Sequence, residues 1–101
     1  KVANRIVDSK KSIKGISKTG IEIHNKYDPI KNAASGTDKL LGKSLKKYGS
    51  KLKPDAVDFK NGIIYELKPY NKKAYKRALK QTKRYAKTIG GKWKIVIDMY
   101  R

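Results

Sequence analysis

The chain has 101 residues, of which 27 are basic and only eight are acidic, so its net charge is +19. This length predicts one small domain over residues 1–101 with a modest core, and the charge predicts a polyanionic partner, with nucleic acid favoured over a membrane surface. The chain has no cysteine, which excludes disulfides and thiolate catalysis, and no run of 18 apolar residues, so we expect no membrane embedding.

The first thirty residues carry weak structural signals. Residues 1–19 are polar and basic and predict a weak helix or a loosely docked lead-in, before a core of residues 20–101. Residues 21–24 fit a helix or a strand, because alternation over four positions cannot decide. The chain begins with Lys1 and no signal peptide precedes it, so we expect it to be the C-terminal fragment of a larger protein.

Turn and cap signals divide the next segment. Asp28-Pro29 favours a turn, and the small polar residues 32–36 favour a loop. Thr37 or Asp38 can cap a short helix, which Gly49 would close.

The middle of the chain predicts a β-hairpin. Two apolar runs, 56–59 and 63–67, flank Asn61-Gly62, which is a strong signal for a two-residue type I′ turn. In that register Val57 faces Glu66 and Asp55 faces Lys68.

The last third predicts a long helix and a strand. Asn71 can cap a helix that runs to about Ile89 and ends at Gly90-Gly91, since its apolar residues recur at helical spacing. Residues 93–99 then alternate as a strand. The predicted fold class is α/β (α+β), with a small mixed sheet flanked by helices.

Three of the eight acidic residues (Asp55, Asp58 and Glu66) fall in or beside the hairpin. The expected register places Asp55 and Glu66 on the same face as Lys68, and Asp58 on the other face, although a bulge would reverse this. Two carboxylates suit a divalent cation, chiefly Mg²⁺, with Mn²⁺ or Zn²⁺ as alternatives. A neighbouring lysine can orient or deprotonate an attacking water, so this set predicts phosphodiester hydrolysis, with Asp58 as the alternate ligand.

The predicted long helix has no acidic residue from Asn71 to Ile89. A solvated face normally mixes charges of both signs, so we expect phosphate contacts here. Tyrosines lie among these charges, and one or two can stack on unpaired bases, although most are expected to pack in the core. The expected nucleic-acid-binding residues are Lys72, Lys73, Lys76, Arg77, Lys80, Lys83, Arg84, Lys87 and Tyr85.

Pro54-Asp55 followed by Glu66-Leu67-Lys68 resembles the signature of the PD-(D/E)XK nucleases, which share the restriction-endonuclease-like fold. The longer run 53–71, with Gln81 and Tyr85 downstream, is similar to nuclease toxin domains at the C-termini of bacterial polymorphic and contact-dependent growth inhibition toxins. The resemblance covers roughly residues 20 to 99.

The resemblance implies roles for individual residues. Asp55 and Glu66 would bind the metal, and Lys68 would be the catalytic lysine. Glu22 would bind the metal directly or through water, and Gln81 would lie at the edge of the site. Similar toxin domains cleave DNA or transfer RNA, and the limited apolar surface slightly favours structured RNA.

The resemblance also implies partners and a place of action. A producer cell would export the domain within a larger protein, and the domain would act in the cytoplasm of a target bacterium. An acidic immunity protein would neutralise it, and a host cytosolic factor is a further expected partner. The competing hypothesis is a non-catalytic basic module that binds nucleic acid, in which the carboxylates only reduce the surface charge. The lone His24 is expected to be structural or simply exposed.

Overall fold

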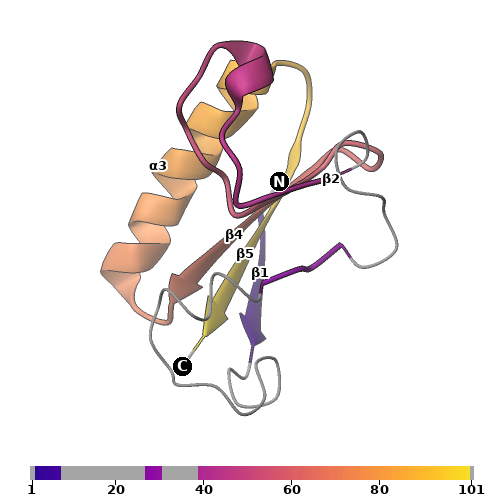
Figure 1. The fold of residues 1–101 in the computed structure, drawn as a ribbon. Helices are drawn as coiled ribbons and strands as arrows, with labels where there is room; N and C mark the ends of the chain where they lie inside the picture. Colours follow the sequence, from indigo (N-terminus) through magenta and orange to yellow (C-terminus); the bar gives the residue numbers. More distant parts are fainter. Residues whose placement is uncertain (1, 8–26, 31–38, 101) are drawn as a thin grey trace.

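The computed structural model describes residues 2–7, 27–30 and 39–100, and these form a mixed sheet with a long helix packed on one face. Figure 1 shows this arrangement. The elements are β1 (Val2–Val7), β2 (Lys39–Leu41), a 3₁₀ turn (Lys46–Tyr48), β3 (Ala56–Asp58), β4 (Ile63–Pro69), α3 (Lys72–Ile89) and β5 (Lys94–Tyr100).

The five strands lie in the order β1-β5-β4-β3-β2. Strands β1, β5 and β4 run parallel to one another, while β4, β3 and β2 form an antiparallel meander. Helix α3 makes the crossover between the parallel neighbours β4 and β5, which is the usual connection for such a pair. The predicted α+β class with a mixed sheet is therefore confirmed.

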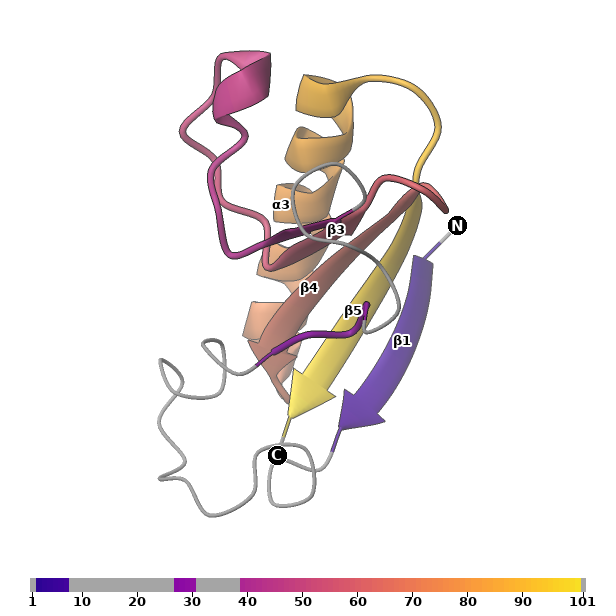
Figure 2. The same ribbon diagram turned by 45° about the vertical axis from the view of Figure 1, so that its right-hand side comes forward.

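The two faces of the sheet are covered by different segments. Helix α3 covers one face, where Val57 and Ile64 pack with Tyr85 of the helix. Residues 27–30 cross the other face (Figure 2), where Ile30 packs with Ala56, Tyr65 and Val96. Because side chains alternate along a strand, β2, β3 and β4 each contribute to both clusters.

Two predictions for the N-terminal half are wrong. Val2–Val7 is an edge strand parallel to β5, where a weak helix or lead-in was expected. The helix expected after Thr37 is replaced by β2 and the 3₁₀ turn, although Gly49 does end that turn with a left-handed φ of 71°.

Contacts that are distant in sequence explain β2. The Lys39 ammonium is buried and lies 3.1 Å from Asp28, and it donates to the Ile30 carbonyl at 2.8 Å. Leu40 pairs with Val57 of β3. These tertiary contacts override the local helix signals, as they often do over so few residues.

The hairpin between β3 and β4 has a four-residue loop in place of the expected two-residue turn. Asp58 pairs with Ile63, so the register is displaced by two residues from the prediction. The Asp58 carboxylate accepts hydrogen bonds from the Asn61 backbone N–H (3.0 Å) and side-chain amide (2.8 Å). Asn61 keeps a negative φ, which a type I′ turn does not allow. Since the displacement is an even number of residues, every side chain keeps its predicted face.

Candidate active site

The centre of the candidate site is the pair Asp55 and Glu66, which lie opposite one another where β3 begins. Ala56 pairs with Tyr65, so the next position outward brings Asp55 to Glu66. The Leu67 backbone N–H donates to Asp55 Oδ2 at 2.7 Å, and the Asp55 N–H lies 3.4 Å from Glu66 Oε1. The Asp55 carbonyl accepts from Gly42 at 2.9 Å, so contacts from both neighbouring strands fix this residue.

Lys68 completes the cluster from the same strand as Glu66. The two residues are separated by one position, so both side chains project from the face that α3 covers. Lys68 Nζ lies 3.6 Å from Glu66 Oε2, and the lysine side chain retains 20% exposure. The lysine therefore lies between the buried Glu66 carboxyl and solvent.

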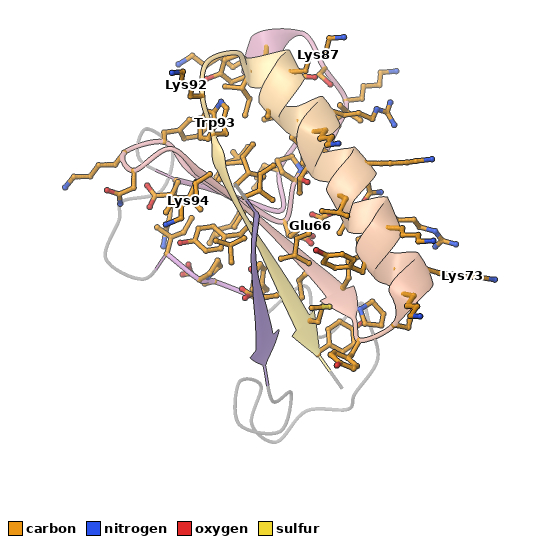
Figure 3. The ribbon with its side chains drawn as sticks, turned by 180° about the vertical axis from the view of Figure 1, so that it is seen from behind. Glu66, Lys73, Lys87, Lys92, Trp93 and Lys94 are labelled. Atoms are coloured by element: carbon orange, nitrogen blue, oxygen red, sulfur yellow. The ribbon has the colours of Figure 1, made fainter. Side chains whose placement is uncertain are left out.

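Glu66 is a carboxyl group in an unfavourable place for a negative charge. It is 2% exposed and lies between the sheet and α3 (Figure 3). Burial, followed by the charge of Asp55 and a hydrogen bond with its side chain, raises the pKa of Glu66 to about 8, although Lys68 acts in the opposite direction. Near neutral pH the Glu66 carboxyl therefore stays largely protonated in the metal-free protein.

Helix α3 places Tyr85 above this pair. The helix begins at Asn71, whose side chain accepts from the Ala74 N–H at 2.8 Å, and it ends before Gly90, as predicted. Tyr85 is buried, and its hydroxyl lies 3.4 Å from the Lys53 carbonyl. Burial, then the charges of Glu66 and Asp55, raise the pKa of Tyr85, so this phenol stays protonated at physiological pH.

Gln81 lies one helical turn before Tyr85 on α3. Its Oε1 atom is buried, and no group among the described residues donates a hydrogen bond to it. An unsatisfied buried oxygen is unfavourable and uncommon, and a bound water, ion or ligand is one explanation for it. This atom is therefore a candidate acceptor for a ligand of the site.

Tyr100 is a neighbour of the site that the sequence did not indicate. It pairs with Pro69 of β4 in the parallel register, and its carbonyl accepts from the Tyr70 N–H at 2.8 Å. Burial and then the charge of Asp55 raise the pKa of its phenol. No sequence signal marked it, because it lies just beyond the expected end of the last strand.

The basic residues of α3 are all exposed, in agreement with a charged outer helix face. Figure 3 shows Lys73 and Lys87 extending from α3 away from the sheet. The other members are Lys72, Lys76, Arg77, Lys80, Lys83 and Arg84. The outer face of α3 therefore presents only positive charge to an approaching polyanion.

Not every predicted site residue joins this cluster. Asp58 lies on the opposite face of the sheet from Asp55, and both of its oxygens accept hydrogen bonds from Asn61. Glu22 and His24 lie outside the described residues. The structure thus brings together Asp55, Glu66 and Lys68, with Tyr85 alongside.

The donor set fits a hard divalent cation. In the described part of the chain, no group of three or more acidic, histidine or cysteine side chains is placed to hold a metal. Mg²⁺ is commonly bound through one or two carboxylates, with water and substrate phosphate as the remaining ligands, so Asp55 and Glu66 suffice. A cation bound between the two residues would replace the proton that Glu66 carries in the metal-free protein.

Comparison with known proteins gives one match. The model of a family described as restriction endonuclease fold toxin 9 matches residues 13–100. No curated protein and no solved structure matches this chain. Among the described residues, no helix has the length and apolar character needed to cross a membrane.

Proposed function

This chain belongs to the restriction endonuclease fold toxin family, and on that basis we propose that it is a metal-dependent nuclease that hydrolyses phosphodiester bonds. The observation that carries this proposal is the approach of Lys68 to the paired carboxylates of Asp55 and Glu66. We propose RNA as the substrate, with transfer RNA ahead of DNA, because the small surface suits a compact structured RNA.

The residues would divide the reaction between them. Asp55 and Glu66 would hold Mg²⁺, with Mn²⁺ or Zn²⁺ as substitutes and Glu22 as an additional ligand. The bound metal would supply charge neutralisation at the scissile phosphate. Lys68 Nζ, which is partly exposed, would orient the attacking water and stabilise the charge that grows on the phosphate oxygens.

Two residues of α3 would support this site. Gln81 Oε1 would accept a hydrogen bond from a water molecule or the substrate, which would satisfy a buried oxygen that has no described partner. Tyr85 would act as a positioning residue, since its protonated phenol lies beside both carboxylates.

The basic face of α3 would bind the phosphate backbone. Its eight exposed cations would release counterions from the nucleic acid, so binding would weaken steeply as the salt concentration rises. Because α3 also carries Gln81 and Tyr85, the same helix would contact the nucleic acid through its outer face and the candidate site through its inner face.

Membership in a toxin family supports a proposal about partners and location. We propose that a producer cell exports this domain within a larger protein and that it acts in the cytoplasm of a target bacterium. An acidic immunity protein would protect the producer, with fast association steered by the net charge of +19. A host cytosolic factor is a further proposed partner.

The decisive experiment incubates the domain with total transfer RNA and with plasmid DNA, in Mg²⁺ or in EDTA. We expect cleavage of transfer RNA in Mg²⁺ and none in EDTA, and we expect Lys68→Met to cleave about 10²–10³ times more slowly than the parent. Salt-dependent binding without cleavage in any divalent metal would contradict the nuclease proposal. That outcome would favour a non-catalytic nucleic-acid-binding module.

A further inference from the structure

A pocket of about 430 Å³ lies at the start of α3, and two of its five lining residues are tyrosines. It is lined by Tyr70, Asn71, Lys72, Tyr75 and Met99. Tyr70 is 50% exposed, and it is the one large hydrophobic side chain in the described part of the chain with this degree of exposure. Tyr75 and Met99 are partly buried and pack beside Ala78, Ile95 and Ile97, so they form a fixed floor.

The pocket adjoins the candidate active site. Met99 is the register partner of Lys68 on the neighbouring parallel strand, so the two side chains project from the same face of the sheet. Lys68 in turn lies 3.6 Å from Glu66. The distance along β4 from Glu66 to the level of Met99 is two residues, or about 7 Å.

The chemistry of the pocket restricts what can occupy it. Two phenol rings and a thioether offer flat, polarisable contacts, while Lys72 lies in the wall and Lys73 and Lys76 follow on α3. An apolar peptide or a lipid chain would not use this surrounding positive charge. A nucleotide uses both the aromatic surface and the positive charge, because its base can stack on tyrosine and its phosphates can pair with lysine.

We propose that this pocket binds an unpaired nucleobase next to the scissile phosphate, with Tyr70 as the stacking residue. This inference rests on the proposed nuclease function and specifies its substrate as a nucleic acid with a single-stranded or unstacked nucleotide at the cleavage point. A fully paired duplex cannot place a base on Tyr70 unless that base first leaves the stack, which costs free energy. Fluorescein-labelled oligonucleotides can test the pocket without any cleavage step.

The experiment uses the domain with Lys68→Met in EDTA, so that no substrate is consumed. Fluorescence anisotropy measures its binding to single-stranded RNA, single-stranded DNA and the matched duplexes. Adding Tyr70→Ala should weaken binding to single strands by about 5- to 150-fold and leave duplex binding within about twofold. Tyr70→Phe should bind single strands as tightly as the unmodified pocket, because it keeps the ring.

Lys72→Ala provides the electrostatic control, since it should weaken single-strand and duplex binding alike. The proposal would be overturned if the domain bound single strands equally well with and without Tyr70→Ala. It would also be overturned if Tyr70→Ala lowered the affinity for single strands and for duplexes by the same factor. No binding of any single strand would also overturn it. The RNA and DNA arms show which sugar the pocket accepts.

Cleavage then separates this proposal from the proposed function. With the Lys68-containing domain, a single abasic position beside the cut site should slow cleavage, and Tyr70→Ala should remove that sensitivity. A domain that cleaves with no response to abasic positions keeps its nuclease function and loses the pocket assignment. A domain that binds single strands through Tyr70 but cleaves nothing keeps the pocket and loses the nuclease function.

Discussion

Asp55 and Glu66 are opposed across the junction of β3 and β4, with the Asp55 N–H 3.4 Å from Glu66 Oε1 and their side chains hydrogen-bonded to one another. Two carboxyl groups in this position cannot both ionise easily, since Glu66 is almost fully buried. Ionisation of Glu66 beside Asp55 is therefore unfavourable, even in a chain with a large excess of cations. A bound proton or a bound metal relieves this cost.

The raised pKa of Glu66 predicts how the stability of the metal-free domain depends on pH. Its pKa is about 8 in the folded protein and near the ordinary 4.5 when unfolded, so between these values the folded state binds more protons. The free energy of unfolding should then fall as pH rises from about 4.5 to 8. Urea unfolding in EDTA at several pH values measures this.

Glu66→Gln is the control for the pH dependence. Its amide does not titrate, while Asp55, Lys68 and Tyr85 remain in place around it, so the difference between the two proteins isolates Glu66. We expect a flatter profile for Glu66→Gln over the same range. A parent domain that gained stability over this range, relative to Glu66→Gln, would contradict the proton held at Glu66.

Metal binding should stabilise the domain through the same two residues. A ligand at a hundred times its Kd adds about 2.7 kcal/mol to the free energy of unfolding, so Mg²⁺ should raise the melting temperature. Asp55→Asn and Glu66→Gln should each remove most of this increase. Asp58→Asn serves as the comparison, because its carboxylate bonds Asn61 on the other face of the sheet and should leave the metal response intact.

The three-residue cluster also predicts the kinetics of Lys68→Met. This variant keeps the length of the side chain and removes the ammonium group, so cleavage should slow by about 10²–10³ while nucleic acid binding changes little. Lys60→Met removes an exposed charge from the hairpin loop and should cleave at nearly the parent rate. Parent-like cleavage by Lys68→Met would mean that this lysine is not the catalytic group.

The sequence predicted the elements whose signals are local. Asn71, the helical spacing of apolar residues and Gly90 define α3 without help from the rest of the chain, and the structure follows them. The hairpin was predicted on the correct face but in the wrong register. The sequence could not show that the Asp58 carboxylate would accept two hydrogen bonds from Asn61 and that the loop would have four residues.

The elements that the sequence missed depend on distant partners. β2 is stabilised by the burial of Lys39 against Asp28 and by its pairing with β3, neither of which leaves a periodic signal. The position of Tyr100 near Asp55 likewise requires the parallel register of β5 with β4. The carboxylate pair itself was predictable. Side chains alternate between the two faces of a sheet, so a displacement of two residues leaves each side chain on its predicted face.

The basic face of α3 predicts a salt dependence that can be assigned to individual charges. Replacing Lys76 and Lys83 by glutamine should lower the slope of log binding constant against log salt by about 0.7–0.9 for each phosphate that is no longer neutralised. Lys60 and Lys92 are exposed elsewhere, so replacing them by glutamine gives the same net charge. If both double variants lower the slope equally, net charge and not the α3 face governs binding.

Gln81 offers a separation of stability from activity. Its buried Oε1 lacks a described partner, and such an atom is typically unfavourable by about 1–3 kcal/mol. Gln81→Met keeps the length of the side chain and removes the polar group, so the substrate-free domain should unfold at a higher temperature. Cleavage should nevertheless slow, because the acceptor proposed for water or substrate is gone. If Gln81 has only a packing role, the variant should cleave at the parent rate. The melting temperature and the cleavage rate, measured on the same preparation, distinguish the two roles.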